Sequence, residues 1–97
     1  MMADVVHTEI TEEAVIVRRL KEEGFFNIFT WYDRAGTRYG VHTHPHHEVR
    51  WILTGRLVIE EAGRSIELGP GDRMESEPET PHSAYAPEDV RYVCGSR

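Results

Sequence analysis

Histidines gather in one short segment of this 97-residue chain, at a spacing that could place several imidazoles around a metal ion. His42 and His44 are two residues apart in a stretch that reads as a strand, so their side chains share one face. Glu48 has the same parity beyond a turn at Pro45, and His82 can add a third imidazole from a distant strand. Such nitrogen and oxygen ligands suit iron(II), manganese, nickel, copper or zinc. The sequence therefore predicts a site for one divalent transition metal.

The spacing around this segment resembles the first motif of the cupin family. That motif is a glycine, five residues, His-x-His, three or four residues, a glutamate, six residues and a second glycine. The chain satisfies each of these spacings, with the matching residues Gly36, His42, His44, Glu48 and Gly55. Residues 36–55 therefore carry the resemblance.

A second cupin motif is matched only in part, by residues 71–86. Gly71 and His82 have the spacing of its glycine and its histidine. Glu77 and Glu79 stand where the family has a proline and a glycine, and Ala86 stands where it has an asparagine. We therefore expect the loop before His82 to depart from the family's shape.

The resemblance implies both a fold and a set of metal ligands. In most cupins the two histidines, the glutamate and the later histidine bind the metal, which implies this role for His42, His44, Glu48 and His82. The family fold is an all-β double-stranded β-helix, also called a jelly-roll barrel. A single cupin domain is expected over residues 1–97.

Two further histidines, His46 and His47, follow Pro45 in the expected loop. A histidine beside a loop proline is more often solvated, or in contact with a ligand side chain, than bound to the metal. We therefore assign neither of them as a ligand.

The strand expected at residues 48–54 places an arginine inside the barrel. If Glu48 faces the metal, Arg50 has the same parity and lies about 6 to 7 Å further along. A buried guanidinium needs an anion, because an unpaired buried charge is costly. Two interpretations stay open: Arg50 binds an anionic group of a substrate, or it forms an internal ion pair with a glutamate such as Glu75 or Glu77.

The opposite face of the same strand is apolar, with Val49, Trp51 and Leu53 at its odd positions. Such a stripe would be an exposed apolar patch on a monomer. We expect a second sheet layer or a second copy of the chain to cover it. The resemblance to cupins favours a homodimer.

Short β-branched and aromatic runs separated by turn residues dominate the rest of the chain, as in all-β barrels. The best helical candidate, residues 11–20, contains Val15, Ile16 and Val17 in a row, which favours a strand instead. Glycine and proline predict tight turns at residues 61–64 and 68–72. The expected strands are 14–21, 25–33, 37–43, 48–54, 56–61, 65–68, 72–75 and 82–86, with 90–94 closing the barrel.

The amino-acid composition restricts the kinds of partner that the protein is expected to bind. The formal net charge is −6, with 17 acidic and 11 basic side chains, which gives no basic surface for nucleic acid. No run approaches the roughly 18 apolar residues of a membrane span, and residues 1–13 lack a secretion signal. The single cysteine, Cys94, cannot form an internal disulfide, which fits a reducing compartment. We expect a cytoplasmic protein with no nucleic acid or membrane partner.

Three functions stay open at this point. The first is a metal-dependent enzyme, a dioxygenase or an isomerase-like activity on a small, anionic substrate. The second is a barrel that binds a small ligand without converting it, as a sensor or a sequestering module. It is supported by the lack of an obvious acid or base beyond the ligands. In the third the metal is only structural.

Overall fold

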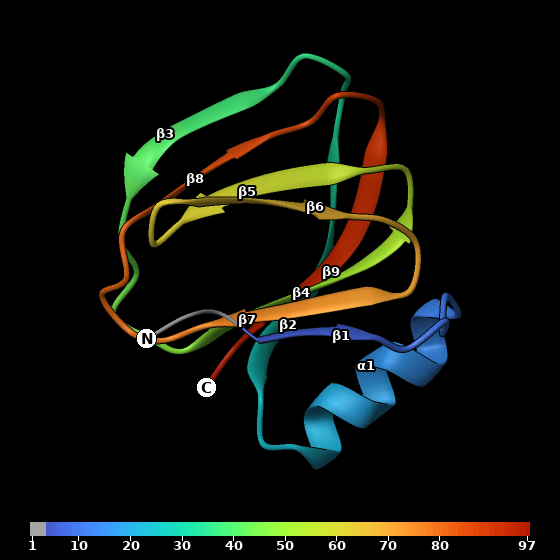
Figure 1. Ribbon diagram of the computed structural model, residues 1–97. Coiled ribbons are helices and arrows are strands. Elements are labelled where there is room, and N and C mark those ends of the chain that lie inside the picture. Colours follow the sequence, from blue (N-terminus) through green and yellow to red (C-terminus); the bar gives the residue numbers. More distant parts are fainter. Residues whose placement is uncertain (1–3) are drawn as a thin grey trace.

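The computed structural model describes residues 4–97, which form nine strands and one helix (Figure 1). The strands build two antiparallel sheets, so the expectation of an all-β protein is confirmed. In chain order the elements are β1 (Asp4–His7), α1 (Glu13–Glu22), β2 (Phe26–Asp33), β3 (Arg38–His42), β4 (Glu48–Thr54), β5 (Leu57–Glu61), β6 (Arg64–Leu68), β7 (Asp72–Ser76), β8 (His82–Tyr85) and β9 (Val90–Ser96).

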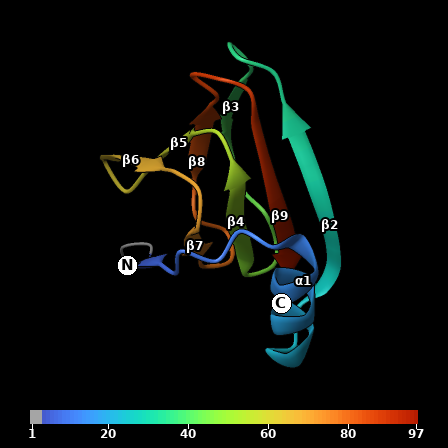
Figure 2. The ribbon, with the colours of Figure 1, turned by 90° about the vertical axis from the view of Figure 1, so that its right-hand side faces the viewer.

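The two sheets are separate layers that Figure 2 shows from the side. One has the strand order β1, β7, β4, β9, β2, and the other has the order β3, β8, β5, β6. β4 lies at the centre of the five-stranded sheet, where Glu48 is the register partner of Ser76 on β7 and of Ser96 on β9. Because side chains alternate along a strand, the even-numbered residues of β4 face the space between the sheets.

Apolar side chains from both sheets fill much of this space. Burying one aliphatic side chain contributes roughly 1.5 to 3 kcal/mol, so this cluster holds the two layers together. Its buried members are Ile52, Leu57, Ile59, Ile66, Leu68, Met74, Ala86, Val90 and Tyr92.

The strand expected at residues 14–21 is wrong, because this segment forms helix α1. Ile16 and Leu20, one helical turn apart, are both 0% exposed, so a single face of the helix is buried. The lower helix propensity of the β-branched run costs only tenths of a kcal/mol per residue, less than the burial gains. With ten residues, α1 is too short to cross a membrane, and residues 4–97 contain no other helix.

Helix α1 covers the apolar stripe of β4. It lies outside the barrel, beneath the five-stranded sheet in Figure 1, and its buried residues share one core cluster with Val49, Trp51 and Leu53. The indole Nε1–H of Trp51 donates to the carbonyl of Ile10, 3.0 Å away, just before the helix. The expected cover is therefore a helix, and neither a second sheet layer nor a second copy is needed there.

The remaining expected strands are present, and most bounds differ by one or two residues. The strand at residues 48–54 has the expected bounds. β1 was not expected; it pairs antiparallel with β7, with Val5 opposite Met74. Its four residues are too few for a pattern of alternation to stand out in the sequence.

Two glycines at the ends of strands occupy positions that only glycine fits. Gly55 has φ +81°, and a Cβ there would lie 2.0 Å from the carbonyl oxygen of Asp89. Gly71 has φ +86°, and a Cβ there would lie 2.7 Å from the Cα of Glu9. Both residues belong to the cupin-like motifs, so these motif glycines serve close backbone packing.

Candidate metal centre

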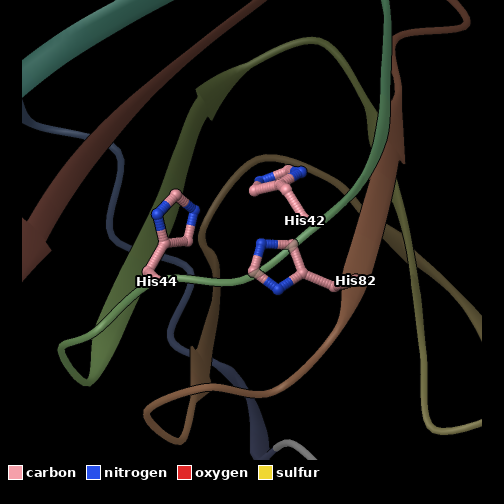
Figure 3. Close-up of side chains that lie close together, drawn as sticks. All are labelled: His42, His44 and His82. Carbon is pink, nitrogen blue, oxygen red and sulfur yellow. The ribbon is translucent and has the colours of Figure 1, made fainter.

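Three histidines from two distant parts of the chain converge on one point (Figure 3). His42 ends β3 and is the register partner of His82, which begins β8. His44 lies just beyond β3, in the loop that leads to β4. One ring nitrogen of each histidine lies within 4.8 Å of the others, and the group combines a buried side chain with two half-buried ones. The structure thus brings together the three imidazoles that the sequence singles out.

Backbone carbonyls orient two of these rings. His42 Nδ1 lies 2.7 Å from the carbonyl oxygen of Gly40, and His82 Nδ1 lies 3.0 Å from that of Thr80. Each carbonyl can only accept, so both Nδ1 atoms carry the proton and each Nε2 is left as the acceptor. At His82 this Nε2 faces Arg50 Nη2, 3.4 Å away. Fixing the tautomer in this way is what a metal-binding imidazole requires.

Burial keeps His82 neutral. Loss of solvent lowers its pKa from 6.5 to about 4, and the nearby positive charge of Arg50 contributes in the same direction. A neutral imidazole is the form that binds a metal, so the donor set fits a divalent transition metal.

Glu48 lies in the same cavity but outside the group of three histidines. Its carboxylate accepts a hydrogen bond from the hydroxyl of Ser96, the register partner of Glu48 on β9. The inward direction expected from strand parity is therefore present. A role for Glu48 as the fourth ligand stays a prediction.

Arg50 is buried and points into the cavity, as strand parity predicts. Its Nη1 donates to Ser76 Oγ at 2.6 Å, and its Nη2 lies 3.4 Å from His82 Nε2. Burial lowers the pKa of the guanidinium from its ordinary value. Arg50 therefore lies beside the three histidines.

No ion pair joins Arg50 to Glu75 or Glu77 within residues 4–97. Glu75 instead pairs with Arg73 at 3.1 Å and with His47 at 2.8 Å. Ser76 links Arg50 to the carboxylate of Glu61, because the Ser76 hydroxyl accepts from Arg50 and donates to Glu61 Oε1 at 2.6 Å.

Sequence reasoning missed Glu61 and Ser76. Glu61 was available from strand alternation, because it has the parity of Leu57 and Ile59, both buried on β5. Ser76 gave no signal of its own, since a serine at the end of a strand is usually part of a turn. Together the two residues hold the Arg50 side chain in place.

The other histidines of the segment lie apart from the three. His46 packs edge-on against Phe26, with ring centroids 5.2 Å apart. His47 Nε2 lies 2.8 Å from Glu75 Oε1. Neither joins the group of possible ligands among the described residues.

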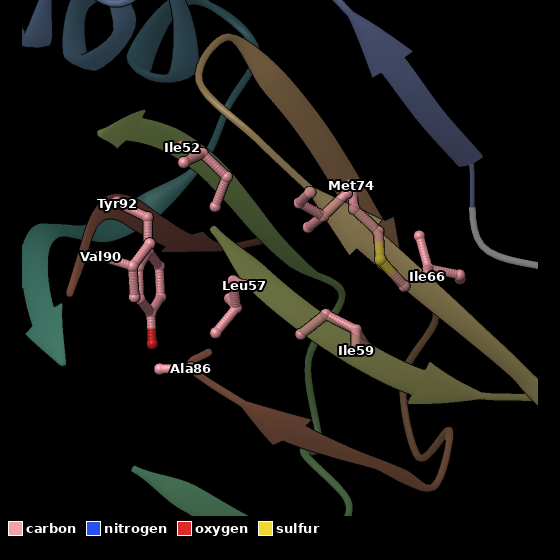
Figure 4. Close-up of a cluster of buried hydrophobic side chains, with 9 residues drawn as sticks. Ile52, Leu57, Ile59, Ile66, Met74, Ala86, Val90 and Tyr92 are labelled. Carbon is pink, nitrogen blue, oxygen red and sulfur yellow. The ribbon is translucent and has the colours of Figure 1, made fainter. Parts of the chain in front are cut away.

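The three histidines, Glu48 and Arg50 line a cavity of about 240 Å³. One part is apolar and includes Leu57, Ile59 and Tyr92, which Figure 4 shows. Burial raises the pKa of Cys94 to about 12, so this cavity residue stays a neutral thiol. The full lining is Phe29, Trp31, Tyr39, His42, His44, Glu48, Val49, Arg50, Leu57, Ile59, His82, Ala84, Tyr92 and Cys94.

Similar solved structures share the fold of this chain. A cupin superfamily protein from Desulfitobacterium hafniense DCB-2 has a TM-score of 0.68 and 17% identity, over 71% of this chain and 63% of that one. The DMSP lyase of Ruegeria pomeroyi DSS-3 has a TM-score of 0.67 and 28% identity, over 72% and 36%. A salicylate 1,2-dioxygenase mutant from Pseudoaminobacter salicylatoxidans, in complex with gentisate, has a TM-score of 0.67 and 20% identity, over 71% and 19%. The chain spans less than two thirds of each of these proteins.

No curated protein has significant sequence similarity to the chain. The family model of the cupin domain matches residues 30–95, more than half of the sequence. This range includes both motif segments and all three converging histidines. The jelly-roll fold implied by the resemblance is confirmed, and the chain belongs to the cupin family.

Proposed function

We propose that this cupin is a metal-dependent enzyme, with dioxygenase or isomerase-like activity on a small anionic substrate. One divalent transition metal (iron, manganese, nickel, copper or zinc) would be held by His42, His44, Glu48 and His82. The observation that carries the proposal is the convergence of three imidazoles next to buried Arg50, in one cavity.

The side chains of the cavity have different roles in the proposed reaction. A metal held there would supply Lewis acidity or, as iron(II), redox chemistry. Arg50 binds the anionic group of the substrate, and Ser76 holds its guanidinium in one orientation. Leu57 and Ile59 present apolar surface that excludes water from the reacting group.

The names of two similar structures support an enzymatic function for this chain. One is a lyase that acts on DMSP, and the other is a dioxygenase solved with gentisate. Both act on small molecules, and the cavity of this chain has the size for one. The choice of reaction depends on the metal, because the fold hosts many activities.

A non-catalytic ligand-binding barrel is the second candidate, and one observation favours it. The hydroxyls of Tyr39 and Tyr92 both donate to Asp33, and Cys94 is a neutral thiol. Apart from the histidines, Glu48 is the one residue of the cavity lining that could act as a base at neutral pH. A site with so few groups for proton transfer would capture a ligand without converting it.

Substrate consumption separates the two candidates. Metal-restored protein is incubated in air with a panel of small carboxylates, and each carboxylate is followed by NMR. The proposal predicts consumption that is lost in Arg50→Met and kept in Arg56→Met, since Arg56 is exposed and pairs with Glu67. Stoichiometric binding without consumption supports the second candidate. If the protein neither binds nor consumes any of the carboxylates, both candidate functions are contradicted. The metal would then have only a structural role.

We also propose a cytoplasmic homodimer, on the family resemblance alone, because α1 already covers the stripe that suggested a partner. Light scattering at micromolar concentration gives the mass. A value near 22 kDa, twice the 11.2 kDa of the chain, supports the dimer, and a value near 11.2 kDa contradicts it.

A further inference from the structure

One wall of the cavity is made of aromatic rings that remain open to solvent. Phe29 and Trp31 on β2 and Tyr39 on β3 all line the cavity, yet they are 47%, 45% and 36% exposed. β2 and β3 are edge strands of the two sheets, so this wall lies where the barrel meets solvent. Aromatic residues whose role is core packing would be buried, so these three call for another explanation.

A buried carboxylate behind the wall fixes its rings. Asp33 is 5% exposed, and its Oδ1 accepts from Trp31 Nε1 at 3.0 Å and from the Tyr39 hydroxyl at 2.5 Å. Its Oδ2 accepts from the Tyr92 hydroxyl at 2.7 Å. Three rings of the cavity lining are thus tied to one carboxylate before any ligand arrives, which lowers the entropy lost on binding.

These hydrogen bonds also determine which part of the aromatic side chains a ligand can contact. The polar atoms of Trp31, Tyr39 and Tyr92 are directed to Asp33, so ring surface is what remains for the cavity. Trp31 meets Phe29 edge-on, with centroids 5.8 Å apart and an angle of 77°. A ligand group that matches such a surface is flat and apolar.

The strand register places Phe29, a residue of the aromatic wall, two strands away from Arg50. Phe29 is opposite Cys94 on β9, and Cys94 is opposite Arg50 on β4. Neighbouring strands are about 4.8 Å apart, so the backbones of Phe29 and Arg50 are roughly 10 Å apart across β9. Phe29, Cys94 and Arg50 all line the cavity. The cavity volume of about 240 Å³ is below the range of roughly 300 to 1,000 Å³ usual for drug-sized ligands, which leaves room for about one ring.

We propose that the cavity takes a small planar aromatic carboxylate, with its carboxylate on Arg50 and its ring against Phe29, Trp31 and Tyr39. This inference rests on the proposed anion-binding role of Arg50 beside the metal. It adds that Asp33 is a positioning residue, which acts on the ligand through the rings that it holds.

Two probes of equal charge and similar size test the proposal. Benzoate and cyclohexanecarboxylate are titrated into metal-restored protein by calorimetry; the first has a flat aromatic ring and the second a puckered saturated one. We expect benzoate to bind about three- to tenfold tighter, the magnitude of one aromatic contact. Trp31→Leu and Asp33→Asn should bring the ratio close to one, with metal content unchanged.

Tyr32→Leu is the matched control, because Tyr32 is an exposed aromatic residue of β2 outside the cavity lining. It should keep the preference for benzoate. Phe29→Leu gives a second test of the wall should Trp31→Leu fail to fold.

Failure of this inference differs from failure of the proposed function. If both probes bind equally and both are lost in Arg50→Met, the anion site stands and the aromatic wall has no such role. A preference that survives both Trp31→Leu and Phe29→Leu also overturns the inference. If neither probe binds the metal-restored protein, the role of Arg50 fails together with the inference.

Discussion

His42 and His82 are register partners across β3 and β8, with ring centroids 4.5 Å apart. They are forty residues apart in the chain, so strand pairing alone brings them together. A register shift of one residue would turn one ring to the opposite face of the sheet. The candidate metal centre therefore depends on the pairing of two strands, and metal binding should in turn stabilise that pairing.

Metal removal should lower thermal stability. A metal present at about 100 times its dissociation constant stabilises the folded state by about 2.7 kcal/mol. In a domain of this size 1 kcal/mol corresponds to about 4 °C or more in Tm. We therefore expect a chelator to lower Tm by at least about 10 °C in scanning calorimetry, and to leave the Tm of His82→Ala unchanged. An equal Tm with and without chelator in the original chain would contradict this expectation.

Loss of the helix contact should expose the stripe of β4. Leu20 is 0% exposed and packs in the cluster that contains Trp51. Leu20→Ala should lower the free energy of unfolding by about 2 to 5 kcal/mol, as measured in urea. Arg18→Ala, on the exposed face of α1, should change it by less than about 0.5 kcal/mol. Equal effects of the two substitutions would show that α1 does not cover the stripe.

Gly55 should tolerate no side chain. Gly55→Ala combines a positive φ with a Cβ 2.0 Å from a backbone oxygen, so we expect a loss of more than about 2 kcal/mol in the free energy of unfolding. Gly63→Ala is the matched control, with φ +74° and no atom within 4 Å of the added Cβ. It should cost only the backbone strain, about 1 to 2 kcal/mol. A smaller loss for Gly55→Ala than for Gly63→Ala would contradict the close approach to Asp89.

The ion pair of Glu23 and Arg73 should make stability depend on pH. The hydrogen bonds from Arg73 hold the pKa of Glu23 below its ordinary value of 4.5. A lowered pKa stabilises the folded state above about pH 4.5, and this contribution is lost as the pH falls through the folded-state pKa. Glu23→Gln should therefore cost up to about 1 kcal/mol at pH 7, since the side chain is 32% exposed, and almost nothing near pH 3.

Urea unfolding at the two pH values measures this difference. Glu22→Gln removes a neighbouring exposed carboxylate for which residues 4–97 offer no ion pair. The cost of Glu22→Gln should be small and equal at the two pH values. A cost for Glu23→Gln that stays constant from pH 7 to pH 3 would rule out the ion pair as its source.

Most of the candidate site could be predicted because four of its residues lie within residues 42–50. His82 is distant in the chain and was predicted from the spacing of the second cupin motif. His42 and His44 are two residues apart at the end of β3, and Arg50 follows Glu48 at the same parity on β4. Each of these relations needs only a period of two residues. The route by which Arg50 obtains its counter-charge could not be predicted, because it joins β4, β7 and β5 through Ser76 and Glu61.

Helix α1 shows where a prediction from the local sequence pattern is wrong. Val15, Ile16 and Val17 favour a strand, and the small differences in propensity are outweighed once Ile16 and Leu20 pack against the sheet. The apolar face of β4 was the available signal, since it required a cover, but sequence alone did not say which segment supplies it. Tertiary packing therefore decided the conformation of residues 13–22.

Elemental analysis tests the central claim most directly. The chain is purified without added metal or chelator, beside His82→Ala and the matched control His46→Ala, whose ring packs on Phe26 outside the three. We predict about one equivalent of a divalent transition metal in the original chain and in His46→Ala, and almost none in His82→Ala. No metal in any of them, even after reconstitution, or equal metal in all three, would contradict a centre built on His42, His44 and His82.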